Sequence, residues 1–194
     1  MVHTLTQGSL VIYDTEWTSW SGFMESNWQQ PGHHMEIIQI GAVKLDVEDN
    51  FKEIDSFQCF VKPLINPELS DYIIELTGIT QTTVDHHGVS FPDALKQFLT
   101  FIGEEICALI SYGRDKSIVD KNCKIHNIPM PTTFEIERDI RKYLLNLGLI
   151  HENSFSSDVP SLLGLPNSER SHDALGDARS LGASFRHLRE QGTI

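Results

Sequence analysis

The stretch Leu10-Val11-Ile12-Tyr13-Asp14-Thr15-Glu16 decides the fold of this 194-residue chain. Four apolar, β-forming residues are followed at once by acidic ones, which predicts a buried central strand. Side chains two residues apart on a strand point to the same face, so Asp14 and Glu16 would lie together. Two buried carboxylates are costly unless a cation lies between them. Alone, however, an Asp-x-Glu pattern is more often a solvated strand end.

The rest of the chain predicts one α/β domain with a mixed sheet. Gly78 is expected to end the first helix, Asp158 to cap helix 159–163 and Ser171 to cap the last helix. The element order predicts that the first strand is central and that a ligand cleft lies beyond strand carboxyl ends. Further strands are expected at 36–45, 54–62, 106–112 and 134–140, and helices at 69–78, 91–102, 114–126, 141–147, 159–163 and 172–190.

The composition argues against a protein that coats nucleic acid by bulk electrostatics, because 15 Lys+Arg stand against 27 Asp+Glu. A metal-holding active site remains compatible, since a bound cation reverses the local charge. Cys59, Cys107 and Cys123 have no C-x-x-C spacing, which favours a reducing cytoplasm over a disulfide framework or zinc knuckle. No apolar run approaches the roughly 20 residues that span a bilayer, so a cytoplasmic protein is expected.

Later in the chain, further polar residues are candidates for the same site. Asp115 directly follows the predicted strand 106–112, where sheets of this class build their sites, although a carboxylate at a helix N-terminus is also ordinary. Asp120, inside the helix, competes for the role. His172 and Asp177 would lie about 140° apart on a regular helix. Both can face one cleft only if His172 lies at or before the helix start; otherwise it is a surface histidine.

Taken together, these segments resemble the DEDDh exonuclease family, most closely its Eri-type and KapD-like members. The resemblance runs from about Val11 to Leu188 and departs at Arg114, where the family often has an aromatic residue. The matching motifs are Tyr13-Asp14-Thr15-Glu16-Trp17-Thr18, Glu75-Leu76-Thr77-Gly78-Ile79-Thr80, Ser111-Tyr112-Gly113-Arg114-Asp115 and His172-Asp173-Ala174-Leu175-Gly176-Asp177.

The resemblance implies a fold, a cofactor and an activity. The fold would be ribonuclease-H-like, with a mixed five-stranded sheet, three strands antiparallel and two parallel, flanked by helices in a single exonuclease domain, 1–194. The activity would be metal-dependent 3′–5′ hydrolysis of single-stranded RNA or short oligonucleotides with a free 3′ end, releasing nucleoside 5′-monophosphates. A DNA-directed, proofreading-type exonuclease and a non-catalytic nucleic-acid-binding regulator remain alternatives.

The resemblance also implies roles for individual residues. His172 would be the general base. Two Mg²⁺ or Mn²⁺ ions would be bound by Asp14, Glu16, Asp115 and Asp177. Contacts to the substrate would come from Thr15, Trp17 and Thr18, and from Leu76, Thr77, Gly78 and Ile79, the last four holding the terminal nucleotide.

Two further patterns leave alternatives open. All three tryptophans, Trp17, Trp20 and Trp28, lie in one segment after Glu16, and they could stack on bases or cover the sheet as a hydrophobic flap. The expected helix 114–126 carries several basic side chains, which could guide a phosphate backbone or form a solvated face of mixed charge. These basic residues are Arg114, Lys116, Lys121 and Lys124.

Overall fold

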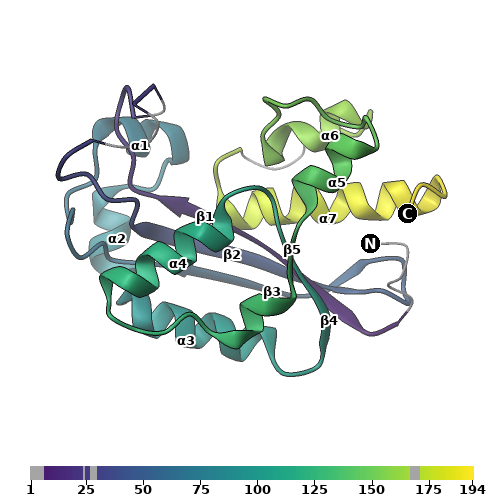
Figure 1. Ribbon diagram of the computed structural model, residues 1–194, viewed down its shortest axis with the longest axis horizontal. Coiled ribbons are helices and arrows are strands. Elements are labelled where there is room, and N and C mark those ends of the chain that lie inside the picture. The colour runs from purple at the N-terminus through teal and green to yellow at the C-terminus, as the bar shows by residue number, and fades with distance from the viewer. Residues whose placement is uncertain (1–6, 24, 27–29, 167–170) are drawn as a thin grey trace.

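A computed structural model describes residues 7–23, 25–26, 30–166 and 171–194. They form one mixed sheet of five strands in the order β3-β2-β1-β4-β5, with helices packed against it (Figure 1). β1 pairs antiparallel with β2 and parallel with β4, and β2 pairs antiparallel with β3. The expected mixed sheet with a central first strand is confirmed. No helix in the described part of the chain has the length and apolar character needed to cross a membrane.

The described residues form five strands, seven α-helices and two short 3-10 turns. The strands are β1 (Ser9–Trp17), β2 (Ile37–Asp46), β3 (Lys52–Phe60), β4 (Ile106–Ser111) and β5 (Glu137–Asp139). The α-helices are α1 (Asp71–Thr77), α2 (Gln81–His87), α3 (Phe91–Ile102), α4 (Asp115–Ile125), α5 (Ile140–Asn146), α6 (Val159–Leu162) and α7 (Ala174–Glu190). Short 3-10 turns are η2 (Thr132–Ile136) and η3 (Ser156–Asp158).

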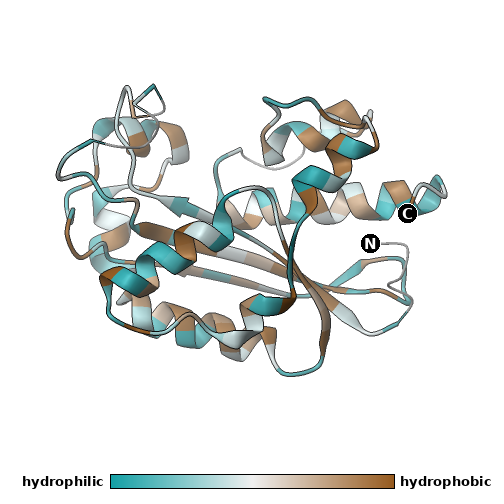
Figure 2. Cartoon of the chain, viewed as in Figure 1, coloured by the Kyte–Doolittle hydropathy of each residue, from teal (hydrophilic) through white to brown (hydrophobic). Residues whose placement is uncertain are grey.

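The alternation of side chains along β1 assigns them to two cores, one on each face of the sheet. Val11 and Tyr13 pack with residues of α3 and α4 in one cluster. Leu10 and Ile12 pack with residues of α5 and α7 in the other. Figure 2 shows hydrophobic colours along the central strands and alternating colours on the helices around them. Because Asp14 and Glu16 continue the Leu10–Ile12 parity, their side chains belong to the face that α7 covers.

Two parts of the secondary structure differ from the expectation. The strand expected at 134–140 is only β5, three residues long, because the preceding chain turns as η2 and buries Phe134 under the sheet. Helix α2 was not predicted. Its sequence has few strong helix formers, and it is held by the Thr80 cap and by the buried Val84.

The predicted helix starts also need correction. The last helix begins at Ala174, and its cap is Asp173 rather than Ser171, because the Asp173 side chain accepts the N–H of Gly176. Asp158 makes no side-chain cap to α6, since its carboxylate accepts the N–H of Phe155 in the preceding turn. The predicted end of the first helix at Gly78 is confirmed by its left-handed backbone, φ 70°.

Candidate active site

The start of α7 lies on β2, directly beside the two carboxylates of β1. Gly41 pairs with Asp14 across the strands, and Gln39 pairs with Glu16. A Cβ atom on Gly41 would lie 2.1 Å from the backbone nitrogen of Leu175, so only glycine lets the helix approach this closely. The missing side chain therefore brings the N-terminus of α7 next to Asp14 and Glu16.

His172 and Asp177 meet at this helix start. His172 precedes α7 and has a left-handed backbone, φ 61°, which turns the chain before the helix begins. Its N–H donates to Oδ2 of Asp177 at 3.3 Å. One ligand atom each from Glu16, His172 and Asp177 lies within 4.8 Å of the other two. His172 lies before the helix start, as the expectation that both residues face one cleft requires.

Asp115 reaches the same end of β1 from α4, which packs on the face of the sheet opposite to α7. It begins α4 just after β4 ends, and its Oδ1 accepts hydrogen bonds from both the backbone N–H and the hydroxyl of Thr15. Its side chain is 2% exposed. The competing Asp120 instead forms an ion pair with Lys124 at 2.5 Å, on a more exposed part of the helix. The structure thus brings Asp115, and not Asp120, to the β1 carboxylates.

Burial, together with nearby negative charges, raises the pKa values of the clustered carboxylates. Burial raises the pKa of Asp14 well above its ordinary value, and the negative charges of Asp115 and Asp177 raise it further. Burial and Asp177 have the same effect on Glu16. Burial also raises the pKa of Asp115 to about 7, against the lowering effect of the Thr15 hydrogen bonds. Because these buried carboxylates carry like charges, the cluster is suited to hold cations.

Burial also shifts the pKa values of Asp177 and His172. Burial raises the pKa of Asp177 to about 7, against the lowering effect of the His172 N–H. Burial lowers the pKa of His172, so its imidazole is neutral at neutral pH. Among the described residues, Oδ1 of Asp177 is buried without a hydrogen-bond partner. Such an oxygen, in a set of carboxylates, is the ligand type that hard divalent cations prefer.

The residues in β1 and directly after it that are expected to contact substrate make contacts within the protein. Thr15 uses both its N–H and its hydroxyl on Asp115. The Thr18 hydroxyl donates to the carbonyl of His34 and accepts the N–H of Glu36. Trp17 is partly buried against the core. Both threonine hydroxyls are therefore engaged in hydrogen bonds within the protein.

The segment from Leu76 to Ile79 is also anchored internally. The Thr77 hydroxyl donates to the carbonyl of Ile73 and accepts the N–H of Ile79. Ile79 is 5% exposed and packs with Ile38 of β2. Leu76 and Gly78 are only half-buried. In Figure 1, α1, which ends in this segment, lies near the end of β1. Leu76 and Gly78 are therefore its more accessible members.

The tryptophan-rich segment favours the flap interpretation where it is described. The Trp20 ring stacks on His33, with centroids 3.9 Å apart and planes 5° apart, and meets Phe23 edge-on. The Ser70 hydroxyl, at the start of α1, donates to the carbonyl of Ser19 and ties the segment down. Trp28 lies outside the described residues.

The basic residues of α4 favour a face of mixed charge. Lys124 pairs with Asp120, and Lys116 pairs with Glu137 at 3.7 Å. Burial lowers the pKa of Lys121, and the neighbouring Arg114 lowers it further. Lys116 and Lys124 of the expected strip are therefore paired with acidic side chains.

Gln39, Gly41 and Asp173 were missed by the sequence reasoning. A glycine inside a predicted strand does indicate close approach of another backbone. Likewise, an aspartate at the start of a predicted helix is a candidate cap. Gln39 carried no comparable signal, because its role depends on a partner 134 residues away.

A family model of exonucleases, RNase_T, matches residues 11–185. The chain belongs to this exonuclease family. The nuclease domain of 3′hExo, a DEDDh family member bound to rAMP, has a similar structure with a TM-score of 0.84 and 25% identity, covering 97% of this chain and 94% of that one. This likeness confirms the expected ribonuclease-H-like nuclease fold.

Two relatives show the extent of the sequence similarity. The 3′-5′ exonuclease Snipper of Drosophila melanogaster is 26% identical over 95% of this chain and 70% of its own length. The 3′-5′ exoribonuclease 1 of Rattus norvegicus is 28% identical over 75% of this chain but only 44% of its own length. Members of the DEDDh family use divalent metal ions, and the group Glu16, His172 and Asp177 could bind one.

Proposed function

We propose that this chain is a 3′–5′ exonuclease that uses divalent metal ions to hydrolyse single-stranded RNA or short oligonucleotides from the 3′ end. The observation that carries the proposal is the meeting of four buried carboxylates and a histidine at the end of β1. They are Asp14, Glu16, Asp115, Asp177 and His172. RNA is favoured because relatives are named exoribonucleases and because a similar nuclease is described as recognising an mRNA stem-loop at its 3′ end.

The four carboxylates would hold two Mg²⁺ or Mn²⁺ ions. Burial and the neighbouring negative charges raise the pKa values of Asp14 and Glu16, and the unpartnered oxygen of Asp177 offers a ligand, which supports cation binding here. When bound, such ions lower the pKa of water and stabilise charge on the attacking and leaving oxygens. Thr15 would keep one oxygen of Asp115 occupied, so that the other oxygen is left for a cation.

His172 would act as the general base. Its lowered pKa leaves the imidazole neutral, so a ring nitrogen can accept the proton of the attacking water at neutral pH. The water oxygen would bond to phosphorus while the bond from phosphorus to the 3′ oxygen of the preceding nucleotide breaks. The products are a nucleoside 5′-monophosphate and a strand one nucleotide shorter with a 3′ hydroxyl.

The 3′ end would be recognised beside this centre. Leu76 and Gly78 are the accessible members of the segment that ends α1, and the left-handed Gly78 allows close backbone approach. Trp17 directly follows Glu16 and would contact the same nucleotide. A free 3′ hydroxyl is then required for cleavage.

The test uses matched single-stranded RNA and DNA oligomers labelled at the 5′ end and incubated with the protein and Mn²⁺. The proposal predicts a ladder that shortens one nucleotide at a time, faster on RNA, and that disappears with EDTA. Asp14→Asn, prepared in the same way, is the control for a contaminating nuclease. Faster hydrolysis of DNA would instead favour a DNA-directed exonuclease.

A circular single strand tests the requirement for an end. It should remain intact under conditions that degrade the linear strand of the same sequence. Cleavage of the circle at a comparable rate would contradict a 3′-end pocket. Tight binding of the linear strand without any turnover would favour the non-catalytic regulator.

A further inference from the structure

Gln39 joins the sheet to the segment that carries His172. Its side chain is 1% exposed, and its Nε2 donates to Oδ1 of Asp173 at 2.7 Å. Its Oε1 accepts the backbone N–H of Ala174 at 3.0 Å. Only one orientation of the amide satisfies both bonds, because the nitrogen only donates and the oxygen only accepts. One buried side chain therefore holds the two residues that directly follow His172.

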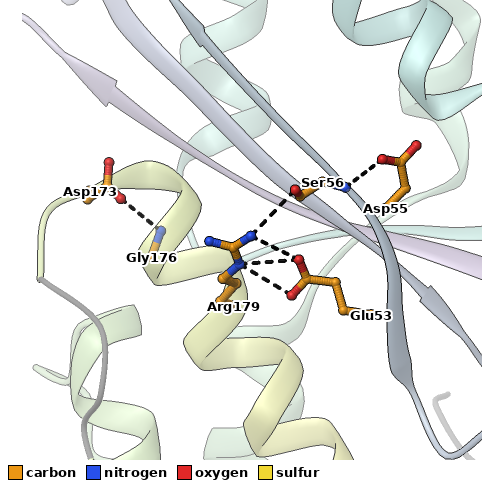
Figure 3. Close-up of polar contacts among 6 residues, drawn as sticks. All are labelled: Glu53, Asp55, Ser56, Asp173, Gly176 and Arg179. Atoms are coloured by element: carbon orange, nitrogen blue, oxygen red, sulfur yellow. Dashed lines mark hydrogen bonds and ion pairs between the residues drawn. The ribbon is translucent and has the colours of Figure 1, made fainter.

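Asp173 connects Gln39 to the start of α7 through its two carboxylate oxygens. Its other oxygen, Oδ2, accepts the N–H of Gly176 and caps the helix (Figure 3). His172 itself has φ 61°, a conformation that a non-glycine residue keeps only where its surroundings impose it. On its carboxyl side, the buried Gln39 holds Asp173 and Ala174, and the exposed Gln58 of β3 adds a longer hydrogen bond to Oδ1 of Asp173 at 3.2 Å. The N–H of His172 itself is held by Asp177.

The same strand pair fixes both the histidine and a proposed metal ligand. Gln39 of β2 lies directly opposite Glu16 of β1, and residues opposite each other in an antiparallel pair share a face. Gln39 thus links the segment that carries His172 to the position in β2 that lies opposite Glu16.

We propose that Gln39 is a positioning residue that holds the backbone of residues 173 and 174 so that the His172 imidazole lies in the active site. The inference rests on the proposed exonuclease function. Gln39 touches no reacting atom in this account, so its loss should lower kcat through His172 and leave KM nearly unchanged.

A second attachment of α7 to the sheet supplies a matched control. Arg179, further along the helix, pairs with Glu53 of β3 at 3.0 Å (Figure 3). Glu53→Gln removes the charge of this pair and leaves Asp173 untouched. If Gln39 only attached α7 to the sheet, a substitution of Gln39 and Glu53→Gln would lower kcat to a similar extent.

The experiment measures kcat and KM on a linear single-stranded oligomer for Gln39→Met, His172→Ala and the double variant. Methionine keeps the length of the side chain and removes both hydrogen bonds. We expect Gln39→Met to lower kcat at least tenfold, with KM changed less than about twofold. In the His172→Ala background, the same substitution should change kcat less than twofold, because the base it positions is already absent. Glu53→Gln should keep kcat within twofold of the wild type.

A second variant tests the same network in case Gln39→Met does not fold. Asp173→Asn keeps an oxygen for the Gly176 N–H but presents its amide nitrogen to Nε2 of Gln39, so it should lower kcat similarly. An equal fold-loss from Gln39→Met with and without His172 would overturn the inference, as would full kcat in a folded variant. Failure of both variants to melt cooperatively would also overturn it, since the network would then be structural. An inactive wild type would instead refute the proposed function.

Discussion

Thr15 donates two hydrogen bonds to a single oxygen of Asp115, from its backbone N–H at 2.9 Å and from its hydroxyl at 2.6 Å. β1 extends past the end of β4, so the Asp115 carboxylate takes the acceptor position that a longer β4 would have supplied. Strand and helix are thereby joined at the carboxylate cluster, and the second oxygen of Asp115 remains for other contacts.

Thr15→Val tests this relationship, because it removes the hydroxyl and keeps the shape. The hydroxyl lowers the pKa of Asp115, so its loss should raise that pKa above about 7. The acidic limb of the plot of activity against pH should then move to higher pH, and kcat at pH 7 should fall about three- to tenfold. A pH profile that superposes on the wild-type profile would show that the hydroxyl does not act on Asp115.

The pH dependence of stability without metal gives a second prediction. Burial raises the pKa of Asp177 from its ordinary value of 3.8 to about 7, so between these values the folded state holds more protons than the unfolded chain. Stability from this group is present at low pH and is lost as pH rises through about 7. In EDTA, the Tm of Asp177→Asn should exceed that of the wild type only slightly near pH 4, and the difference should grow until about pH 7. A Tm difference that does not change with pH would contradict the raised pKa.

His172→Ala should lower kcat by roughly 10²–10⁴, the usual contribution of a positioned general base. The loss should shrink at higher pH, where hydroxide is more abundant. Mn²⁺ affinity should change little. Because ligand atoms of Glu16, His172 and Asp177 lie within 4.8 Å, a collapse of metal affinity would instead identify His172 as a ligand.

Trp20→Ala should act on stability rather than on substrate binding. The indole stacks on His33 and packs against the core, so we expect a loss of about 2–4 kcal/mol in the free energy of unfolding. Affinity for a single-stranded oligomer, measured with Ca²⁺ to prevent turnover, should change less than twofold. A weakening of binding by about 1–3 kcal/mol for all sequences would show base stacking.

The parts of the site that follow from local sequence were predictable. A buried apolar run fixes β1, and its period of two places Asp14 and Glu16 on one face. Gly78 marks the end of α1 because few other residues adopt its backbone angle. These features depend on neighbouring residues alone.

The rest depends on pairing between distant segments. Whether Gln39 faces Glu16 is decided by the register of β1 against β2, which no periodicity reveals. The start of α7 is set by Asp173, and its approach to β2 by Gly41. Helix α2 was missed because packing and the Thr80 cap, rather than propensity, stabilise it.

Binding of Mn²⁺ tests whether the carboxylates at the end of β1 hold divalent ions. Electron paramagnetic resonance of free Mn²⁺ at pH 7.5 should show binding to the wild type and at least tenfold weaker binding to Asp177→Asn. Asp120→Asn, the same chemical change at an acid paired with Lys124, should bind as the wild type does. Equal binding by the wild type and both variants would show that Asp177 and the neighbouring carboxylates do not hold the ions.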